Sequence, residues 1–314
     1  MVSNINLDCW FPKYDVLSEI DRYLIEDWHI EYLLTHEQIL AKMKKVGLSR
    51  WQRFERLCKK KNEKLVTDAM ADFDIHAFHV SDCRRTYILD LIALSFSWMQ
   101  RSSVSGKVID IGCQNGILLK FLAQKFANEF TGIDPSAKAI EAAKEQLKGL
   151  KNVELQIGKL PFETEQKYDL ALCIDVLHHL KPDQQSNAIS CIFGCLNAGG
   201  SAIISTADFH DHKWWSAIQP SLNEFGVELI AAGRVGGAQH GGTFEVKADW
   251  PVTGVGIFKM TENRNAVVDY DALNNAHTFY WDNFFQHYAN FPLTPWHEKT
   301  LSFEAAQRKS AEDY

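Results

Sequence analysis

A carboxylate followed by a glycine-rich turn is the feature of this sequence with the clearest chemical meaning. In the stretch VIDIGCQNG, residues 108–116, Asp110 precedes Gly112 and Gly116. Glycine allows a tight turn and lets a ligand come close to the backbone. A helix that begins near Asn115 would present unpaired N–H groups at the same place. The pattern predicts a site where a carboxylate and bare backbone contact the same ligand.

Three further groups of polar residues stand at the ends of apolar runs. Asp134 ends the run FTGID, and a carboxylate in such a place can accept two hydrogen bonds from a ribose diol. Gly158 and Lys159 follow the run 152–158. The last group lies around the end of a near-continuous apolar run and comprises Cys173, Ile174, Asp175, His178 and His179.

Alternating strand and helix patterns place these groups at one edge of a sheet. Apolar runs predict strands at 107–111, 129–134, 152–158, 168–177 and 199–206, and helical periodicity predicts helices at 115–126, 136–150 and 184–196. This alternation predicts an α/β fold with a doubly wound, mostly parallel, seven-stranded sheet. Ligands of such sheets bind beyond the carboxyl ends of the strands. After a further run at 227–233, the runs 243–249 and 254–260 are expected to form an antiparallel edge.

Helical patterns flank the predicted sheet on both sides. We expect three regions: an N-terminal helical region at 1–103 on the substrate side, a ligand-binding domain at 104–262, and a C-terminal helical tail at 263–314. The tail carries Tyr280, Phe284 and Tyr288 at four-residue spacing, which is typical of an amphipathic helix. It is expected to cover the site, to pack on the N-terminal helices or to form the face of a homodimer.

Composition restricts the class of protein. A net charge of −7 and an isoelectric point of about 5.9 argue against a broad nucleic-acid footprint. The seven cysteines stand singly with no CxxC pair, which favours the reducing cytoplasm over a disulfide framework or a zinc ribbon. No basic region precedes an apolar run at the N-terminus, and no apolar stretch is long enough to span a bilayer. We therefore expect a cytoplasmic protein with no membrane partner.

The quoted segments, taken in order, resemble the class I S-adenosylmethionine (SAM) dependent methyltransferases. VIDIGCQNG is similar to the first motif of that family and TGID to the second. CIDVLHHL is similar to the segment after the fourth strand, and LNAGGSAIIST to the entry into the fifth. The resemblance covers residues 104–260, about half of the chain, and implies a Rossmann-like domain with S-adenosyl-L-methionine as cofactor.

The resemblance also implies a role for each matched position. Gly112 and Gly116 would flank the methionine part of SAM, Asp110 would support the turn and the SAM amino group, and Asp134 would hold the ribose hydroxyls. The other positions implied as cofactor contacts are Cys113, Gln114, Pro135, Gly158, Lys159, Leu160, Cys173, Ile174 and Asp175.

Two positions depart from the family pattern. Gln114 replaces a customary glycine in the middle of the turn, and Lys159 stands where an acidic residue usually bonds the adenine amine. Adenine recognition is therefore expected to rest on backbone groups or on Leu160. Arg84 or Arg85 is expected to pair with the SAM carboxylate.

A glycine-rich turn also occurs in NAD-dependent enzymes, so an NAD-dependent enzyme is the alternative hypothesis. The dinucleotide fingerprint is G-x-G-x-x-G, which admits a pyrophosphate, whereas here three residues separate Gly112 from Gly116. The carboxylate of Asp110 would repel a pyrophosphate and attract an ammonium group. The sign of this charge favours SAM.

Methyl transfer needs few protein groups, because the sulfonium already makes the methyl group electrophilic. A base is required only where the nucleophile arrives protonated, and His178 or His179 suits that role after the fourth strand. One of them is also expected to serve as a structural helix-start residue. His210, just past the fifth strand, is a further candidate for the substrate side. The pairs His76/His79 and His210/His212 have no third ligand fixed by sequence, so no metal is expected.

Motifs that the sequence lacks argue against some classes of substrate. The stretch IDVL occupies the place where methyltransferases of DNA amines or glutamine carry Asn- or Asp-Pro-Pro-aromatic, and no Pro-Cys pair for pyrimidine C5 methylation occurs. A small-molecule substrate is therefore favoured. A tRNA or protein substrate, and a non-catalytic SAM-binding protein with a regulatory or interaction role, remain the alternatives.

Overall fold

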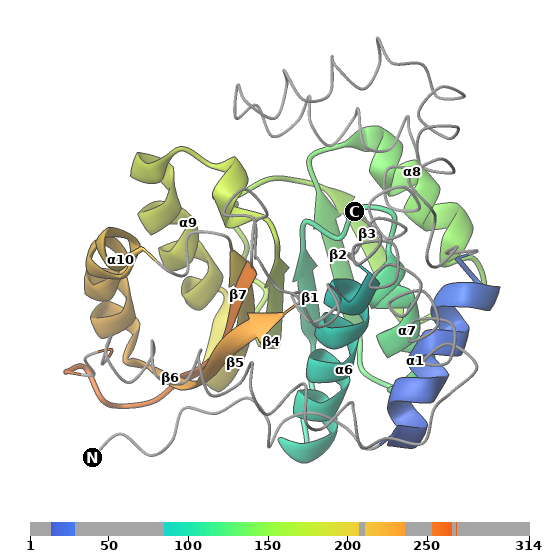
Figure 1. Ribbon diagram of the computed structural model, residues 1–314. Coiled ribbons are helices and arrows are strands. Elements are labelled where there is room, and N and C mark those ends of the chain that lie inside the picture. Colours follow the sequence, from blue (N-terminus) through green and yellow to red (C-terminus); the bar gives the residue numbers. More distant parts are fainter. Residues whose placement is uncertain (1–13, 29–84, 207–210, 236–252, 266–267, 269–314) are drawn as a thin grey trace, which may run out of the picture.

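A mixed sheet with the strand order β3-β2-β1-β4-β5-β7-β6 organises the protein (Figure 1). The computed structural model describes residues 14–28, 85–206, 211–235, 253–265 and 268. Strands β1 to β5 are parallel, and β7 runs antiparallel to both of its neighbours. The strands are β1 (Val108–Ile111), β2 (Phe130–Asp134), β3 (Val153–Ile157), β4 (Tyr168–Ile174), β5 (Leu196–Thr206), β6 (Val227–Val235) and β7 (Thr253–Met260).

This arrangement confirms the predicted α/β fold, with its doubly wound, mostly parallel, seven-stranded sheet and antiparallel edge. The antiparallel strand β7 lies between β5 and the outermost strand β6. The run 243–249, which we expected to pair at this edge, lies outside the described residues, as do 29–84 and 269–314. Within the described part of the chain, no helix is long and apolar enough to cross a membrane.

Helices cover both faces of the sheet, and the side chains of the strands alternate between them. In β4, Leu170 and Leu172 belong to one hydrophobic cluster, whereas Ala171 and Cys173 belong to the other. The first cluster includes residues of α1 (Tyr14–Glu26), α6 (Arg85–Arg101), α7 (Ile117–Lys125) and α8 (Ala137–Gln146). The second includes residues of the 3₁₀ turn η3 (Leu177–His179), α9 (Pro182–Gly194) and α10 (His212–Phe225).

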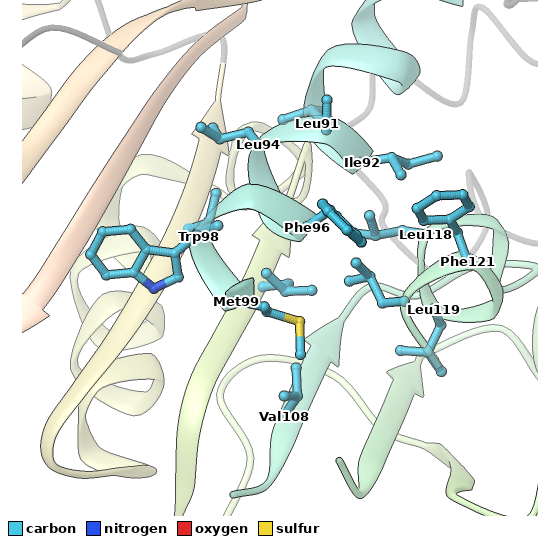
Figure 2. Packing of buried hydrophobic residues seen from close by; sticks show 14 of the residues in the cluster. Leu91, Ile92, Leu94, Phe96, Trp98, Met99, Val108, Leu118, Leu119 and Phe121 are labelled. Atoms are coloured by element: carbon cyan, nitrogen blue, oxygen red, sulfur yellow. The ribbon is translucent and has the colours of Figure 1, made fainter. Parts of the chain in front are cut away.

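The first cluster fixes the helix that follows the glycine turn. Figure 2 shows Phe96 and Met99 of α6 beside Leu119 and Phe121 of α7, above Val108 of β1. Each large apolar side chain buried in this way contributes about 1.5–3 kcal/mol. The start of α7 is thereby held over the end of β1.

Asparagine side chains close the opposite, amino edge of the sheet. Asn128 donates hydrogen bonds to the backbone carbonyls of Val104 and Gly106, at 3.0 and 2.7 Å. Asn152 donates to three carbonyls between the end of α7 and the start of β2, at 3.1–3.2 Å. These bonds satisfy loop carbonyls that would otherwise lack partners. The amino edge is therefore occupied by structural contacts, and the polar groups singled out in the sequence gather at the other edge.

Several predicted boundaries need correction; the fifth strand, for example, begins at Leu196 rather than at residue 199. The fourth strand was expected to continue to residue 177, but β4 ends at Ile174, because Asp175 adopts a left-handed backbone with φ of +60°. The following helix begins at Pro182 rather than at residue 184. Proline is favoured in the first turn of a helix, because its missing N–H has no partner there anyway.

Candidate active site

The order of the strands reverses between β1 and β4, and the candidate residues meet at this point. β2 and β3 lie on one side of β1, whereas β4 and β5 lie on the other. Ile111, the last residue of β1, is in register with Ile133 in β2 and with Cys173 in β4. The glycine turn, Asp134 and the segment after β4 thus follow neighbouring strand ends. Open α/β sheets bind ligands at such a switch point.

The glycine turn has a left-handed backbone at three of its positions. The φ angles of Gly112, Gln114 and Gly116 are +80°, +48° and +84°. The N–H of Gly112 donates to the carbonyl of Ile133 at 2.8 Å, and the N–H of Gln114 donates to Asp134 Oδ2 at 3.0 Å. Gln114 therefore adopts a left-handed backbone, which glycine favours, and Asp134 holds it there.

Neighbouring side chains leave no room for a Cβ atom in this turn. A Cβ on Gly112 would lie 2.3 Å from Cγ2 of Val176, and one on Gly116 would lie 2.8 Å from Cδ1 of Leu147. Val176 follows β4 and Leu147 follows α8, so two distant segments shape the turn. Neither residue was predicted to contact the turn, since nothing local in the sequence shows that they lie over the glycines.

Two buried carboxylates stand beside the turn. Asp110 is 3% exposed and Asp134 is 2% exposed. Burial, and secondly the charge of Asp134, raises the pKa of Asp110 from its ordinary 3.8 to about 7. Burial also raises the pKa of the Cys113 thiol well above 9, so this cysteine stays neutral. The site is an acidic one in which a cation would offset a desolvated negative charge.

Asp134 also organises the start of α8 and the end of β3. Its Oδ1 accepts a hydrogen bond from the N–H of Ser136 at 2.8 Å, and its carbonyl accepts one from Gly158 at 3.0 Å. Lys159 is exposed, whereas Leu160 is buried in the second hydrophobic cluster. Gly158, the first residue of the segment predicted to meet the adenine ring, is therefore bonded to the residue predicted to hold the ribose.

Beyond β4, a strained aspartate faces a histidine. The N–H of Asp175 donates to the carbonyl of Ser205 at 3.1 Å and to its Oγ at 2.9 Å. Oδ1 of Asp175 lies 3.3 Å from Nδ1 of His178, a close contact without hydrogen-bond alignment. The ring centroids of His178 and His179 are 4.0 Å apart. Non-glycine residues in left-handed backbone gather at functional sites. Ser205, at the end of β5, was missed because its contact with Asp175 is long-range.

Some predicted residues cannot be placed in this site. Arg84, His210, His76 and His79 lie outside the described residues, and Arg85 is the first residue of α6 with its side chain outside the description. Among the side chains that the structure does describe, no three His, Cys, Asp or Glu gather in a way that would hold a metal ion.

Comparisons with known proteins find similarity over the part of the chain that carries these residues. Residues 109–202 match a family described as "Methyltransferase domain". The chain is 32% identical over 150 residues to a ubiquinone biosynthesis O-methyltransferase of Pseudomonas fluorescens (strain Pf0-1), covering 46% of this chain and 62% of that one. It is 34% identical over 134 residues to the protein of the same name from Bordetella avium (strain 197N), covering 40% and 54%. The chain thus spans 54–62% of the length of these two relatives.

Among solved structures, the chain is similar to N-methyltransferase NodS from Bradyrhizobium japonicum WM9 in complex with S-adenosyl-L-homocysteine. The identity is 20% and the TM-score 0.47, with 68% of this chain and 99% of that one covered. The matched family spans β1 to β5, which carry the glycine turn, both buried carboxylates and the segment after β4. Residues 109–202 of this chain are therefore similar to a methyltransferase domain, and the two relatives named above are methyltransferases.

Proposed function

We propose that this protein transfers the methyl group of SAM to a nucleophilic atom of a small molecule. The observation that carries the proposal is the pair of buried carboxylates, Asp110 and Asp134, beside the glycine turn at the switch point of the sheet. The acidic net charge favours a small acceptor over a nucleic acid. The relatives named ubiquinone biosynthesis O-methyltransferases favour it as well.

The described residues fit SAM in charge and in hydrogen bonding. Asp110 would face the ammonium group, whose positive charge lowers the cost of ionising a buried carboxylate. A carboxylate has about four lone-pair sites, so Asp134 can hold two backbone N–H groups and still accept bonds from ribose hydroxyls. Asn115 Oδ1, beside the turn, is buried without a partner in the described structure and would accept a ligand donor. A pyrophosphate would instead add to the negative charge of the site.

The remaining cofactor contacts stay predictions. Gly112 and Gly116 would flank the methionine part, and backbone groups from Gly158 to Leu160 would meet the adenine. The residues that we expect to line the rest of the cofactor site are Cys113, Gln114, Pro135, Lys159, Cys173, Ile174, Asp175 and one of Arg84 and Arg85.

We expect Asp134→Asn to weaken the binding of SAM and of S-adenosylhomocysteine by about 10- to 100-fold, which corresponds to losing a bond to a charged acceptor, about 1.5–3 kcal/mol. Asparagine keeps the size of the side chain but replaces one acceptor oxygen by a donor. Calorimetric titration with S-adenosylhomocysteine measures the change. Asp169→Asn is the matched control, since Asp169 lies near the start of β4 and accepts a bond from Asn197 at 2.9 Å. Equal affinity for both variants would contradict the assigned ribose contact.

When bound, SAM supplies an electrophilic methyl group, and the chain aligns the nucleophile and excludes water. For a nucleophile that arrives protonated, His178 is the candidate base. Asp175 faces Nδ1 of His178 at 3.3 Å, so a proton held on Nδ1 leaves Nε2 to accept the proton of the acceptor. Hydrogen bonds of catalytic groups are often poorly aligned before the substrate binds.

We expect His178→Gln to lower the rate of methyl transfer by about 100-fold, the usual scale of losing a general base. The affinity for S-adenosylhomocysteine should not change. His179→Gln is the matched control on the adjacent ring and is expected to retain most of the activity. Turnover of both variants under saturating SAM decides which of the two histidines is the base. A larger loss for His179→Gln would transfer the role of base to that residue.

Methyl transfer from labelled SAM identifies the class of acceptor. A small-molecule methyltransferase is expected to label the low-mass fraction of a metabolite extract and to leave total tRNA and total protein unlabelled. Label in tRNA or in protein would overturn the proposed substrate class. Tight binding of S-adenosylhomocysteine without transfer to any of the three would identify a non-catalytic SAM-binding protein.

A further inference from the structure

Helix α1 precedes the residues matched by the methyltransferase family, yet it packs against the helix that follows the glycine turn (Figure 1). The ring of Tyr23 lies 5.1 Å from that of Phe121, centroid to centroid. Lys120 of α7 pairs with Asp27 at 3.2 Å and lies over the ring of Trp28 at 5.8 Å. Both apolar and charged contacts therefore attach α1, and the two residues that follow it, to α7.

One buried hydrogen bond connects α1 to the first residue of α7. The hydroxyl of Tyr23 donates to the backbone carbonyl of Ile117 at 2.6 Å, across 94 positions of sequence. Tyr23 is 7% exposed, and burial raises its pKa well above 10. The hydroxyl is therefore protonated and a donor throughout the neutral pH range.

The start of α7 lacks a cap of its own. Its N-cap is Gly116, in left-handed backbone and with no side-chain hydrogen bond to the first turn. The first N–H groups of a helix have no partners within the helix, and they favour a negatively charged ligand group. A capping side chain would occupy these donors. Tyr23 bonds a carbonyl instead, so it fixes the start of the helix and leaves the donors to a ligand.

We propose that Tyr23 is a positioning residue for the cofactor: from α1, its hydroxyl holds the start of α7 where the glycine turn and the first-turn N–H groups meet the methionine part of SAM. The inference rests on the proposed cofactor site. It makes α1 a functional part of that site, although α1 lies outside the matched family. Without the bond, Gly116 and its neighbours gain freedom that binding must remove.

Tyr23→Phe tests the proposal, because it removes the hydroxyl and keeps the ring against Phe121. Tyr168→Phe is the matched control, because Tyr168 is a tyrosine that is likewise buried, 3% exposed at the start of β4. Two quantities are measured in the full-length protein, namely calorimetric affinity for S-adenosylhomocysteine and hydrogen exchange of the ligand-free amides at 112–118. Melting temperatures report the stability of both variants.

We expect both variants to melt slightly below the wild type, as each loses the hydroxyl of a buried tyrosine. Only Tyr23→Phe should bind S-adenosylhomocysteine more weakly, by roughly 5- to 10-fold, and only its amides at 112–118 should exchange faster. Equal affinities and equal exchange in the two variants would overturn the role of Tyr23. Absence of binding by the wild type would refute the proposed function and the cofactor role of Tyr23 with it, whereas faster exchange at 112–118 would still show that the Tyr23 hydroxyl holds the start of α7.

Discussion

Asp110→Asn is expected to stabilise the ligand-free protein at pH 8 by about 4 kcal/mol. The reason is that the pKa of Asp110 rises by about three units when the wild type folds, and each unit is worth 1.36 kcal/mol. The cause is burial, and secondly the charge of Asp134. Because the folded-state pKa lies above the unfolded one, the folded state binds the proton more tightly. The contribution of Asp110 to stability should therefore be fully present below about pH 4 and be lost as the pH rises to about 7.

Urea unfolding at pH 5 and at pH 8 measures this effect. Asparagine cannot ionise, so the variant should show a smaller loss between the two pH values than the wild type does. Asp169→Asn is again the control and should follow the wild type. The same Asp110→Asn variant should bind SAM more weakly, because it lacks the charge that would face the ammonium group. Parallel pH profiles for the wild type and Asp110→Asn would show that Asp110 ionises without cost in the folded protein.

Gly112→Ala should destabilise the protein by roughly 2–5 kcal/mol, the sum of left-handed backbone strain and overpacking. Alanine rarely adopts the φ of +80° found here, and its Cβ would lie 2.3 Å from Cγ2 of Val176. Relief of the clash would displace the turn from the end of β1. We therefore also expect binding of S-adenosylhomocysteine to be lost at concentrations that saturate the wild type.

Two further variants, measured by urea unfolding, distinguish the destabilisation caused by backbone strain from that caused by the steric clash with Val176. Gly149 has a φ of +95°, and no atom lies within 4 Å of a Cβ added to it. Gly149→Ala should therefore lower the stability only by the backbone strain, about 1–2 kcal/mol. Adding Val176→Ala to Gly112→Ala makes space for the methyl group and should recover part of the lost stability. If Gly112→Ala were no more destabilising than Gly149→Ala, the close packing of Val176 over the turn would be wrong.

Much of the fold was predictable because local patterns encode it. The β-branched and apolar runs around Ile109, Ile133 and Leu172 indicated buried strands, and helical periodicity over 136–150 indicated α8. The structure adds that the side chain of Ser136 caps this helix by accepting a bond from the N–H of Ala139 at 3.1 Å. Strand order was less accessible to sequence. The position of β7 between β5 and β6 depends on pairings between residues far apart in the chain, which no local pattern carries.

In the candidate site, too, some residues were predictable from the sequence and others were not. Asp110, Gly112 and Asp134 were identified from types and spacing, and the structure places them together. Val176 over Gly112 and Tyr23 on the start of α7 depend on tertiary packing, so sequence could not reveal them. The raised pKa of Asp110 likewise follows from burial, which a sequence indicates only indirectly.

A crystal structure of the protein with S-adenosylhomocysteine tests the central claim most directly. The account predicts ribose hydroxyls within hydrogen-bond distance of Asp134, the amino group near Asp110, and the methionine part against the turn from Gly112 to Gly116. The nucleoside bound elsewhere, with Asp110 and Asp134 free of ligand, would contradict it.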